Sequence, residues 1–80
     1  MKETNKIADI TFDFSIRIIG LYKKLIEDKD FVISKQLLRS ATSIGANVEE
    51  ANAAQTKRDF IAKMSIASKE SRETKYLIRL

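Results

Sequence analysis

The chain has 80 residues, enough for one small domain that buries only about 60 to 65% of its unfolded surface. It contains no Cys and no His, which excludes disulfide bonds and removes the usual zinc ligands, the thiol nucleophile and the commonest acid–base side chain. Its formal net charge is +4. Because neither disulfides nor a metal can stabilise so small a domain, we expect it to be stabilised by association with other chains. We also expect a non-enzymatic protein without catalytic residues or cofactor.

Apolar residues are distributed along the whole chain. No run of about 18 apolar residues is long enough to span a membrane, and no charged and then apolar leader ends in small residues. We therefore expect neither a membrane span nor a signal peptide, and the expected compartment is the cytoplasm.

The composition predicts an all-α fold, because there is no proline and there are only two glycines. The first helix is expected at about residues 6–27, ended by the polar turn 28–30. Residues 11–18 alternate apolar and polar side chains as a strand would. The helical spacing nevertheless continues as far as Ile26, and nothing nearby offers a strand to pair with, so we predict a helix there.

Two further helices complete a single domain. After an apolar connector at residues 31–33, the second helix is predicted at about residues 34–53, with Ser34 as its N-cap. The third is predicted over residues 57–80, because Thr56 and Asp59 resemble a capping box with Asp in place of the usual Glu. No linker, repeat or low-complexity segment divides the chain.

The first and third helices have more apolar surface than one partner face can cover. We expect a fourth helix, a subunit interface or both to cover this surplus, and scattered exposed apolar residues are the alternative. The surplus set comprises Ala8, Phe12, Ile16, Ile19 and Ile26 on the first helix, and Ala62, Ile66, Leu77 and Leu80 on the third.

Residues 43–50 of the second helix combine small, apolar and polar side chains. Small residues allow another backbone to approach closely, whereas an amide such as Asn47 is costly to bury without a hydrogen-bond partner. We therefore predict a packing seam between helices and subunits, and we interpret Asn47 as a hydrogen-bonded packing amide. The predicted packing seam comprises Ala41, Ile44, Gly45, Ala46, Asn47, Val48, Ile66, Leu77 and Leu80.

The whole net positive charge belongs to the third helix. Residues 57–80 contain seven basic and three acidic side chains, whereas residues 1–30 have six of each and residues 31–56 have two of each. Six of the basic residues fall within an arc of about 120° on a helical wheel, a pattern suited to phosphate contacts. We name this arc the basic ridge. It comprises Lys57, Arg58, Lys69, Arg72, Lys75 and Arg79.

The charged residues also have structural interpretations. The basic ridge is alternatively a solvated face on which Lys69 and Glu73 form an i, i+4 ion pair. Glu49, Glu50 and Glu73 lack the His partners of a carboxylate metal site, so we predict no metal. We expect Glu50 or Glu73 to be held by Arg39, or by a helix terminus across a subunit contact.

Several segments closely resemble one known family, the bacterial 23S ribosomal RNA intervening-sequence proteins. They are QLLRSA at 36–41, SIGANVEE at 43–50 and DFIAKMSIA at 59–67, and KESRETKYL at 69–77 continues the similarity. The resemblance implies a single domain over residues 1–80 with an up-and-down four-helix bundle fold, of which three helices are present here and the fourth is absent or truncated. It also implies a ring-shaped homopentamer. Gly45 stands where many relatives have proline, so we expect a less sharply kinked second helix.

The resemblance also suggests a function. Related accessory proteins of diversity-generating retroelements bind nucleic acid and a reverse transcriptase through a basic pentamer. Our leading hypothesis is a homo-oligomer that binds structured RNA or DNA electrostatically through the basic ridge. The alternative is a scaffold or protein-interaction module with no nucleic-acid role, whose partner is a helical segment docking on Ile66, Leu77 and Leu80.

Overall fold

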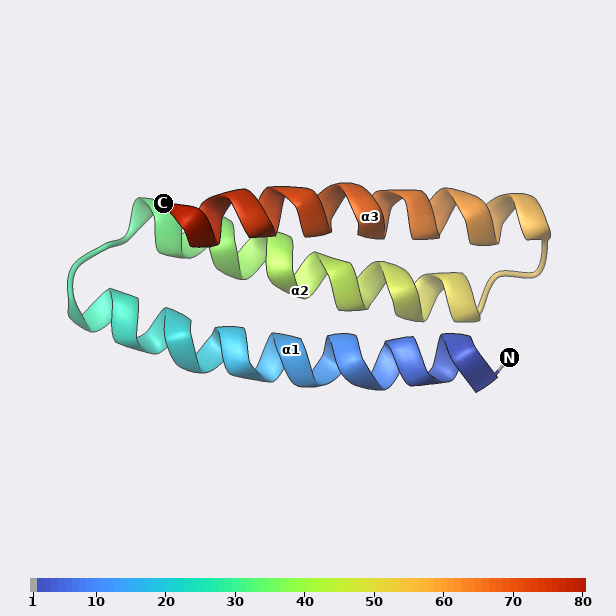
Figure 1. Cartoon of the computed structure of the whole chain (residues 1–80), viewed down its shortest axis with the longest axis horizontal. Helices are drawn as coiled ribbons and strands as arrows, with labels where there is room; N and C mark the ends of the chain where they lie inside the picture. The colour runs from blue at the N-terminus through green and yellow to red at the C-terminus, as the bar shows by residue number, and fades with distance from the viewer. Residues whose placement is uncertain (1) are drawn as a thin grey trace.

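Three α-helices joined by short turns form the structure, a computed structural model that describes the backbone of residues 2–80 and the side chains of residues 5–80 (Figure 1). They are α1 (Lys2–Glu27), α2 (Val32–Asn52) and α3 (Lys57–Arg79), and the described part of the chain contains no strand. The predicted all-α class is confirmed. The helices together measure 43 × 18 × 16 Å along the principal axes.

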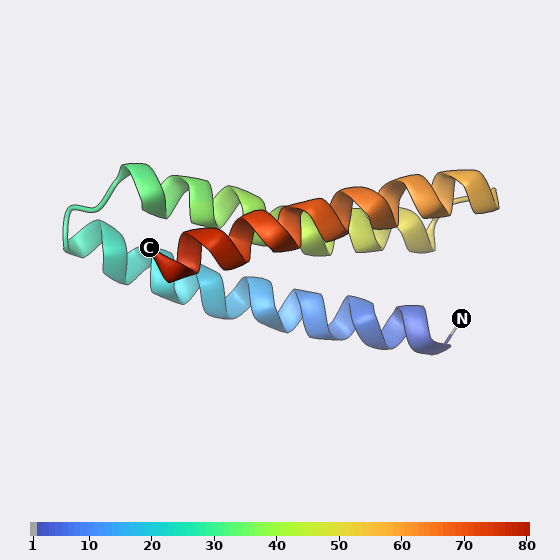
Figure 2. The same cartoon turned by 45° about the horizontal axis from the view of Figure 1, so that its top comes forward.

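α2 lies between the other two helices. It runs antiparallel to α1 and to α3, so the chain follows an up-and-down path (Figure 1, Figure 2). Along the described backbone α2 packs against both neighbours, but no Cα atom of α1 comes within 8 Å of a Cα atom of α3. The two outer helices therefore meet only through side chains.

A residue in the left-handed conformation ends α1. Lys29 has a φ angle of 63°, and the N–H groups of Lys29 and Asp30 donate to the carbonyls of Ile26 at 2.9 Å and Leu25 at 3.0 Å. This is the Schellman arrangement, which satisfies the last carbonyls of a helix and favours glycine at the left-handed position. The predicted stop after Glu27 is thereby confirmed.

α2 begins before the predicted N-cap. Phe31 occupies the N-cap position without a side-chain cap, and the predicted connector residues Val32 and Ile33 are helical. Ser34 is buried in the first turn, where its hydroxyl donates to the Phe31 carbonyl at 3.2 Å. The prediction of Ser34 as N-cap was wrong because the tight turn at Lys29 reverses the chain early, and the helix has restarted before Ser34 is reached.

The start of α3 agrees with the sequence pattern. Thr56 has extended backbone angles (φ −127°, ψ 153°), and its hydroxyl accepts a hydrogen bond from the Asp59 N–H at 3.1 Å. The ends of α2 and α3 fall within one residue of the predicted ones. α1 begins at Lys2 and not at Lys6, since no glycine or proline interrupts the helix there.

The core is built from two clusters of side chains that each join all three helices. Small residues dominate it, and Ala41, Val48 and Ala51 are at most 1% exposed. α2 approaches α1 closely at Gly45, since a Cβ there would lie 3.4 Å from Ser15 Oγ and 3.5 Å from the Thr11 carbonyl oxygen. The buried members are Ala8, Val48 and Ala67 in one cluster and Ile18, Leu37 and Ala41 in the other.

Part of the surplus apolar face of α1 is exposed to solvent, as expected. Phe12 is 61% exposed, Ile16 54% and Ile19 37%. Phe12 lines a hollow between α1 and α2. Ala8, which was placed in the same set, instead belongs to the core, because it faces Val48 and Ala67.

Candidate nucleic-acid interface

The six residues of the basic ridge are all exposed on α3. The buried positions of this helix, Ala67 and Thr74, mark the face that packs toward the other helices. At about 100° per residue, the centre of the ridge lies about 150° around the helix from that face. The ridge as a whole therefore faces outward from α3, with Lys75 and Arg79 at its border with α1.

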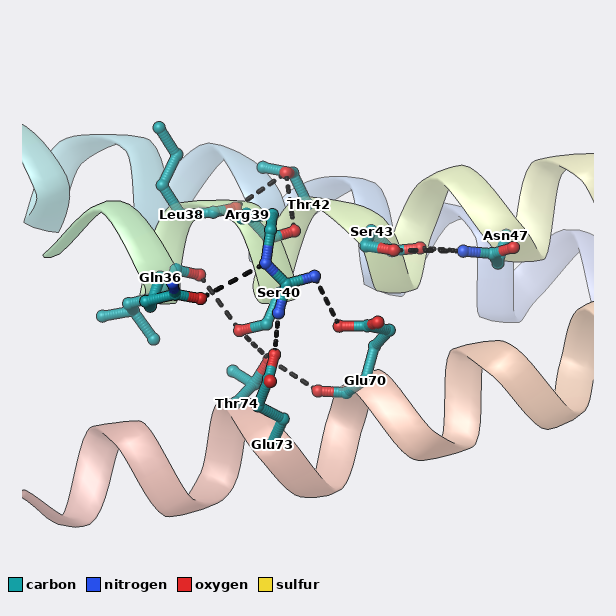
Figure 3. Close-up of polar contacts among 11 residues, drawn as sticks. Gln36, Leu38, Arg39, Ser40, Thr42, Ser43, Asn47, Glu70, Glu73 and Thr74 are labelled. Carbon is teal, nitrogen blue, oxygen red and sulfur yellow. Dashed lines mark hydrogen bonds and ion pairs between the residues drawn. The ribbon is translucent and has the colours of Figure 1, made fainter. Parts of the chain in front are cut away.

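Arg39 of α2 binds two carboxylates of α3 (Figure 3). Its Nη1 lies 3.2 Å from Glu70 Oε2, its Nη2 pairs with Glu73 Oε2, and its Nε donates to Gln36 Oε1 at 3.4 Å. The Glu70 side chain is 12% exposed, whereas those of Arg39 and Glu73 are 50% and 44% exposed. The expected pairing of Glu73 with Arg39 is thus confirmed, and it joins α2 to α3 within one chain.

This arrangement decides between the two interpretations of Lys69. The i, i+4 pair of Lys69 with Glu73 does not form, because Glu73 turns toward Arg39. Among the described side chains, the ion pairs are those of Arg39 alone. Arg72 donates to the uncharged hydroxyl of Ser68 at 3.2 Å, which orients the guanidinium without neutralising it. The ridge therefore keeps its positive charge.

Two buried hydroxyl groups fasten α2 to α3 beside this ion-pair cluster (Figure 3). Ser40 and Thr74 are 0% and 3% exposed, and their side-chain oxygens lie 2.9 Å apart. Thr74 Oγ1 also lies 2.8 Å from the carbonyl of Glu70. Sequence reasoning missed this pair, although both residues occupy positions that helical periodicity assigns to the buried faces.

The packing seam in α2 divides into inward and outward residues. Ala41 and Val48 are buried, and Asn47 is half-buried and donates to the carbonyl of Ser43 at 2.9 Å and to its hydroxyl at 3.1 Å (Figure 3). The amide is hydrogen-bonded within its own helix, as its interpretation as a packing residue requires. Ala46 is exposed.

The seam residues of α3 do not share one face. Ile66 and Leu80 are 40% and 69% exposed, whereas Leu77 packs against the cluster of Ile18 and Leu37. The grouping of Leu77 with the outward residues was wrong. Leu77 faces the core because of the way α3 packs against α1 and α2. A helical wheel of α3 alone carries no information about that packing.

An apolar groove lies between α1 and α3, where their backbones stay apart. Its volume is about 410 Å³, and Ile10, Phe14, Ile44 and Ile78 supply its main apolar lining. Lys75 and Arg79 of the ridge also line it. The sequence indicated surplus apolar surface on both helices, but the groove itself was not predicted, because it depends on α2 lying between them.

Among the described residues, no three His, Cys, Asp or Glu side chains gather closely enough to hold a metal ion. No described helix has the length and apolar character needed to cross a membrane.

The fold and its surfaces define a small up-and-down bundle of three helices with a cationic outer face. The chain belongs to the 23S rRNA-intervening sequence protein family, whose model matches residues 3–80. This confirms the family expected from the segments in α2 and α3.

A solved structure shows the same arrangement. It is a protein of unknown function from the S23 ribosomal protein family of Bacteroides thetaiotaomicron, 52% identical, with a TM-score of 0.93. The match covers 99% of this chain and 70% of that one. No curated protein matches the chain. The comparisons establish the family and the fold.

Proposed function

We propose that this protein is a non-enzymatic, homo-oligomeric bundle that binds the phosphate backbone of structured RNA or DNA through the basic ridge of α3. The name of the family, which refers to an intervening sequence of 23S rRNA, supports RNA as the first ligand to test. Contacts of Lys and Arg with phosphates position a protein on a nucleic acid without reading its bases.

One observation carries the proposal: Arg39 pairs with two of the three acidic residues of α3, Glu70 and Glu73, and so keeps them from neutralising the ridge. Glu70 and Glu73 are the carboxylates that follow Lys69 on this helix, and both bind Arg39 of α2. Lys69 and the three cations after it are therefore exposed to solvent and have no ion-pair partner among the described side chains. An unneutralised row of cations attracts polyanions and gives binding that weakens with salt.

The composition of the ridge favours backbone binding over sequence recognition. Tyr76 is 64% exposed and lies within the same arc, which also contains Ser65 and Ser68. One aromatic ring can stack on one base, but single-strand binders use several such platforms. Shape and phosphate spacing would therefore select the ligand, which favours helical or folded nucleic acids.

Self-association is the second part of the proposal. The exposed side chains of Phe12, Ile16 and Ile19 form an apolar stripe on α1, beside Ala46 of α2. Burial of such a stripe between subunits is the usual means by which a small domain gains stability. In a ring of five, as the family resemblance suggests, several ridges would act together and raise the avidity for a long polyanion.

Charge reversal tests the nucleic-acid role. We expect the double variant Lys69→Glu, Arg72→Glu to weaken binding of a fluorescein-labelled RNA hairpin at least about 10-fold in anisotropy titrations at low salt, through loss of phosphate contacts. The matched control is Lys23→Glu, Lys24→Glu, which makes the same change of charge at exposed positions of α1. Equal weakening by both double variants would show that RNA binding depends only on the net charge of the protein, and the assignment of the binding site to α3 would be rejected.

A further inference from the structure

We propose that the outward face of α3 lies across the minor groove of an A-form RNA duplex, with Arg58 on the phosphates of one strand and Lys69 and Arg72 on those of the other. This ligand preference rests on the proposed function, which assigns nucleic-acid binding to the basic ridge. It predicts that double-stranded RNA is bound more tightly than a DNA duplex, because the spacing of the cations along α3 suits only one kind of groove.

Three cations and one hydroxyl group lie along a single line on α3. Arg58, Ser65, Lys69 and Arg72 are all exposed, and on a helical wheel they fall within about 60° of one another. The centre of this line lies about 170° around the helix from the buried side chain of Thr74. These residues therefore form the part of the basic ridge that points most directly away from the other two helices.

An uncharged gap separates the cations of this line. Arg58 and Lys69 are eleven residues apart on one uninterrupted helix, which corresponds to about 17 Å at about 1.5 Å per residue. The exposed residues between them on the outward side are Ile61, Ala62 and Ser65, none of which is charged. Because phosphate contacts fix how a protein lies on a duplex, this pattern indicates two rows of phosphates with a space between them.

The minor groove of A-form RNA fits this spacing better than the grooves of B-form DNA. The DNA minor groove is about 6 Å wide, which is too narrow for the uncharged gap. The DNA major groove is about 12 Å wide but about 8.5 Å deep, so a helix resting on both strands would hold short side chains above its floor. The minor groove of A-form RNA is wide and shallow, and the gap can reach its floor while the cations contact both strands.

Two serine hydroxyl groups face the groove in this arrangement. Ser65 lies between Arg58 and Lys69, and Ser68 is exposed beside the same line. Ser68 Oγ accepts a hydrogen bond from Arg72 at 3.2 Å, and a hydroxyl that accepts one bond can still donate its own proton. The ribose 2′-hydroxyl is both donor and acceptor and is absent from DNA. Hydrogen bonds from these serines therefore add to the preference for RNA.

Three duplexes of one sequence test the proposal by fluorescence anisotropy at one salt concentration. Each has about 16 base pairs, the length that double-stranded RNA-binding domains cover. We expect the protein to bind the RNA duplex at least about 5-fold more tightly than the DNA duplex. The third duplex is RNA with 2′-O-methyl groups, which keep the A-form and remove the 2′ donor. Its affinity should lie between the other two, because the phosphate spacing is retained.

Matched variants locate the contacts. Arg58→Glu should weaken binding of the RNA duplex at least about 3-fold more than binding of the DNA duplex, because only the RNA groove lets Arg58 reach the second strand. The control Lys24→Glu makes the same change of charge at an exposed position of α1 and should weaken both equally. The double variant Ser65→Ala, Ser68→Ala should lower the preference for RNA at least about 2-fold without changing the salt dependence, since it removes no charge. Circular dichroism checks that all variants fold.

The outcomes separate this proposal from the proposed function on which it rests. Salt-dependent binding that is equally tight for the RNA and DNA duplexes would overturn the A-form preference and leave the basic ridge as a non-selective nucleic-acid site. Tighter binding of single-stranded RNA than of the RNA duplex would also overturn it, as would an RNA-to-DNA ratio that Arg58→Glu and Lys24→Glu leave equally unchanged. The absence of binding to every duplex would overturn both proposals.

Discussion

Replacing Thr74 by valine tests whether the hydroxyl pair between α2 and α3 stabilises the bundle. Valine keeps the shape of threonine and removes only the hydroxyl group. In the native structure that hydroxyl lies 2.9 Å from Ser40 Oγ and 2.8 Å from the Glu70 carbonyl, and both hydroxyl-bearing side chains are buried. Thr74→Val therefore removes these bonds without opening a cavity.

The expected loss combines two costs. A hydrogen bond contributes about 0.5–1.5 kcal/mol net, and a buried polar group left without a partner costs about 1–3 kcal/mol. Ser40 retains only a longer bond of 3.4 Å to the Leu37 carbonyl, so part of the second cost applies. We expect the free energy of unfolding to fall by about 2 kcal/mol, equivalent to a decrease in Tm of about 10 °C for a domain of this size.

Urea denaturation followed by circular dichroism, at one protein concentration, measures this loss. The control is Thr42→Val: the Thr42 hydroxyl donates to carbonyls of its own helix, Leu38 at 2.7 Å and Arg39 at 3.3 Å, and we expect a change below about 0.5 kcal/mol. In a double-mutant cycle with Ser40→Ala, the coupling energy should be about 1 kcal/mol. A loss below about 0.5 kcal/mol for Thr74→Val, or strict additivity with Ser40→Ala, would refute the reasoning.

Other predictions concern the turn, the glycine and the ion-pair cluster. Lys29→Gly should raise the free energy of unfolding by about 1 kcal/mol, because the left-handed conformation is strained for lysine and not for glycine. A decrease in the free energy of unfolding in the same urea assay would contradict this. Gly45→Ala should stabilise by about 0.5–1 kcal/mol, since its Cβ would make ordinary contacts with α1, and Gly45→Leu should destabilise; a loss above about 1 kcal/mol for the alanine would show a tighter approach. Arg39→Gln should cost less than about 1 kcal/mol but weaken RNA binding about threefold by releasing Glu73 toward Lys69, and unchanged binding would contradict this.

The helices could be predicted because their signals are local. The absence of proline, the apolar periodicity and the Thr56 cap all lie within single helices, and each element ends within a few residues of its predicted bound. The exposure of the basic ridge follows from the same local reasoning, because a cationic arc of α3 opposite its apolar positions must face solvent.

Features that depend on the relation between helices could not be predicted in this way. Spacing alone favours a pair of Lys69 with Glu73, but the register of α3 against α2 brings Arg39 closer. Leu77 is buried for the same reason. α2 begins earlier than predicted because Lys29 adopts the left-handed conformation and turns the chain. A glycine at this position would have indicated such a turn in the sequence, whereas a lysine does not. These contacts require the three-dimensional arrangement of α2 and α3.

The salt dependence of nucleic-acid binding tests the central claim most directly. If Lys69, Arg72, Lys75 and Arg79 each neutralise one phosphate, a plot of log affinity against log salt for duplex DNA should have a slope of about −3.6, at about 0.9 per phosphate. The Lys69→Glu, Arg72→Glu variant should reduce that slope by about half. Binding that is absent at about 50 mM salt, or that does not change between about 50 and 200 mM, would contradict an electrostatic interface on α3.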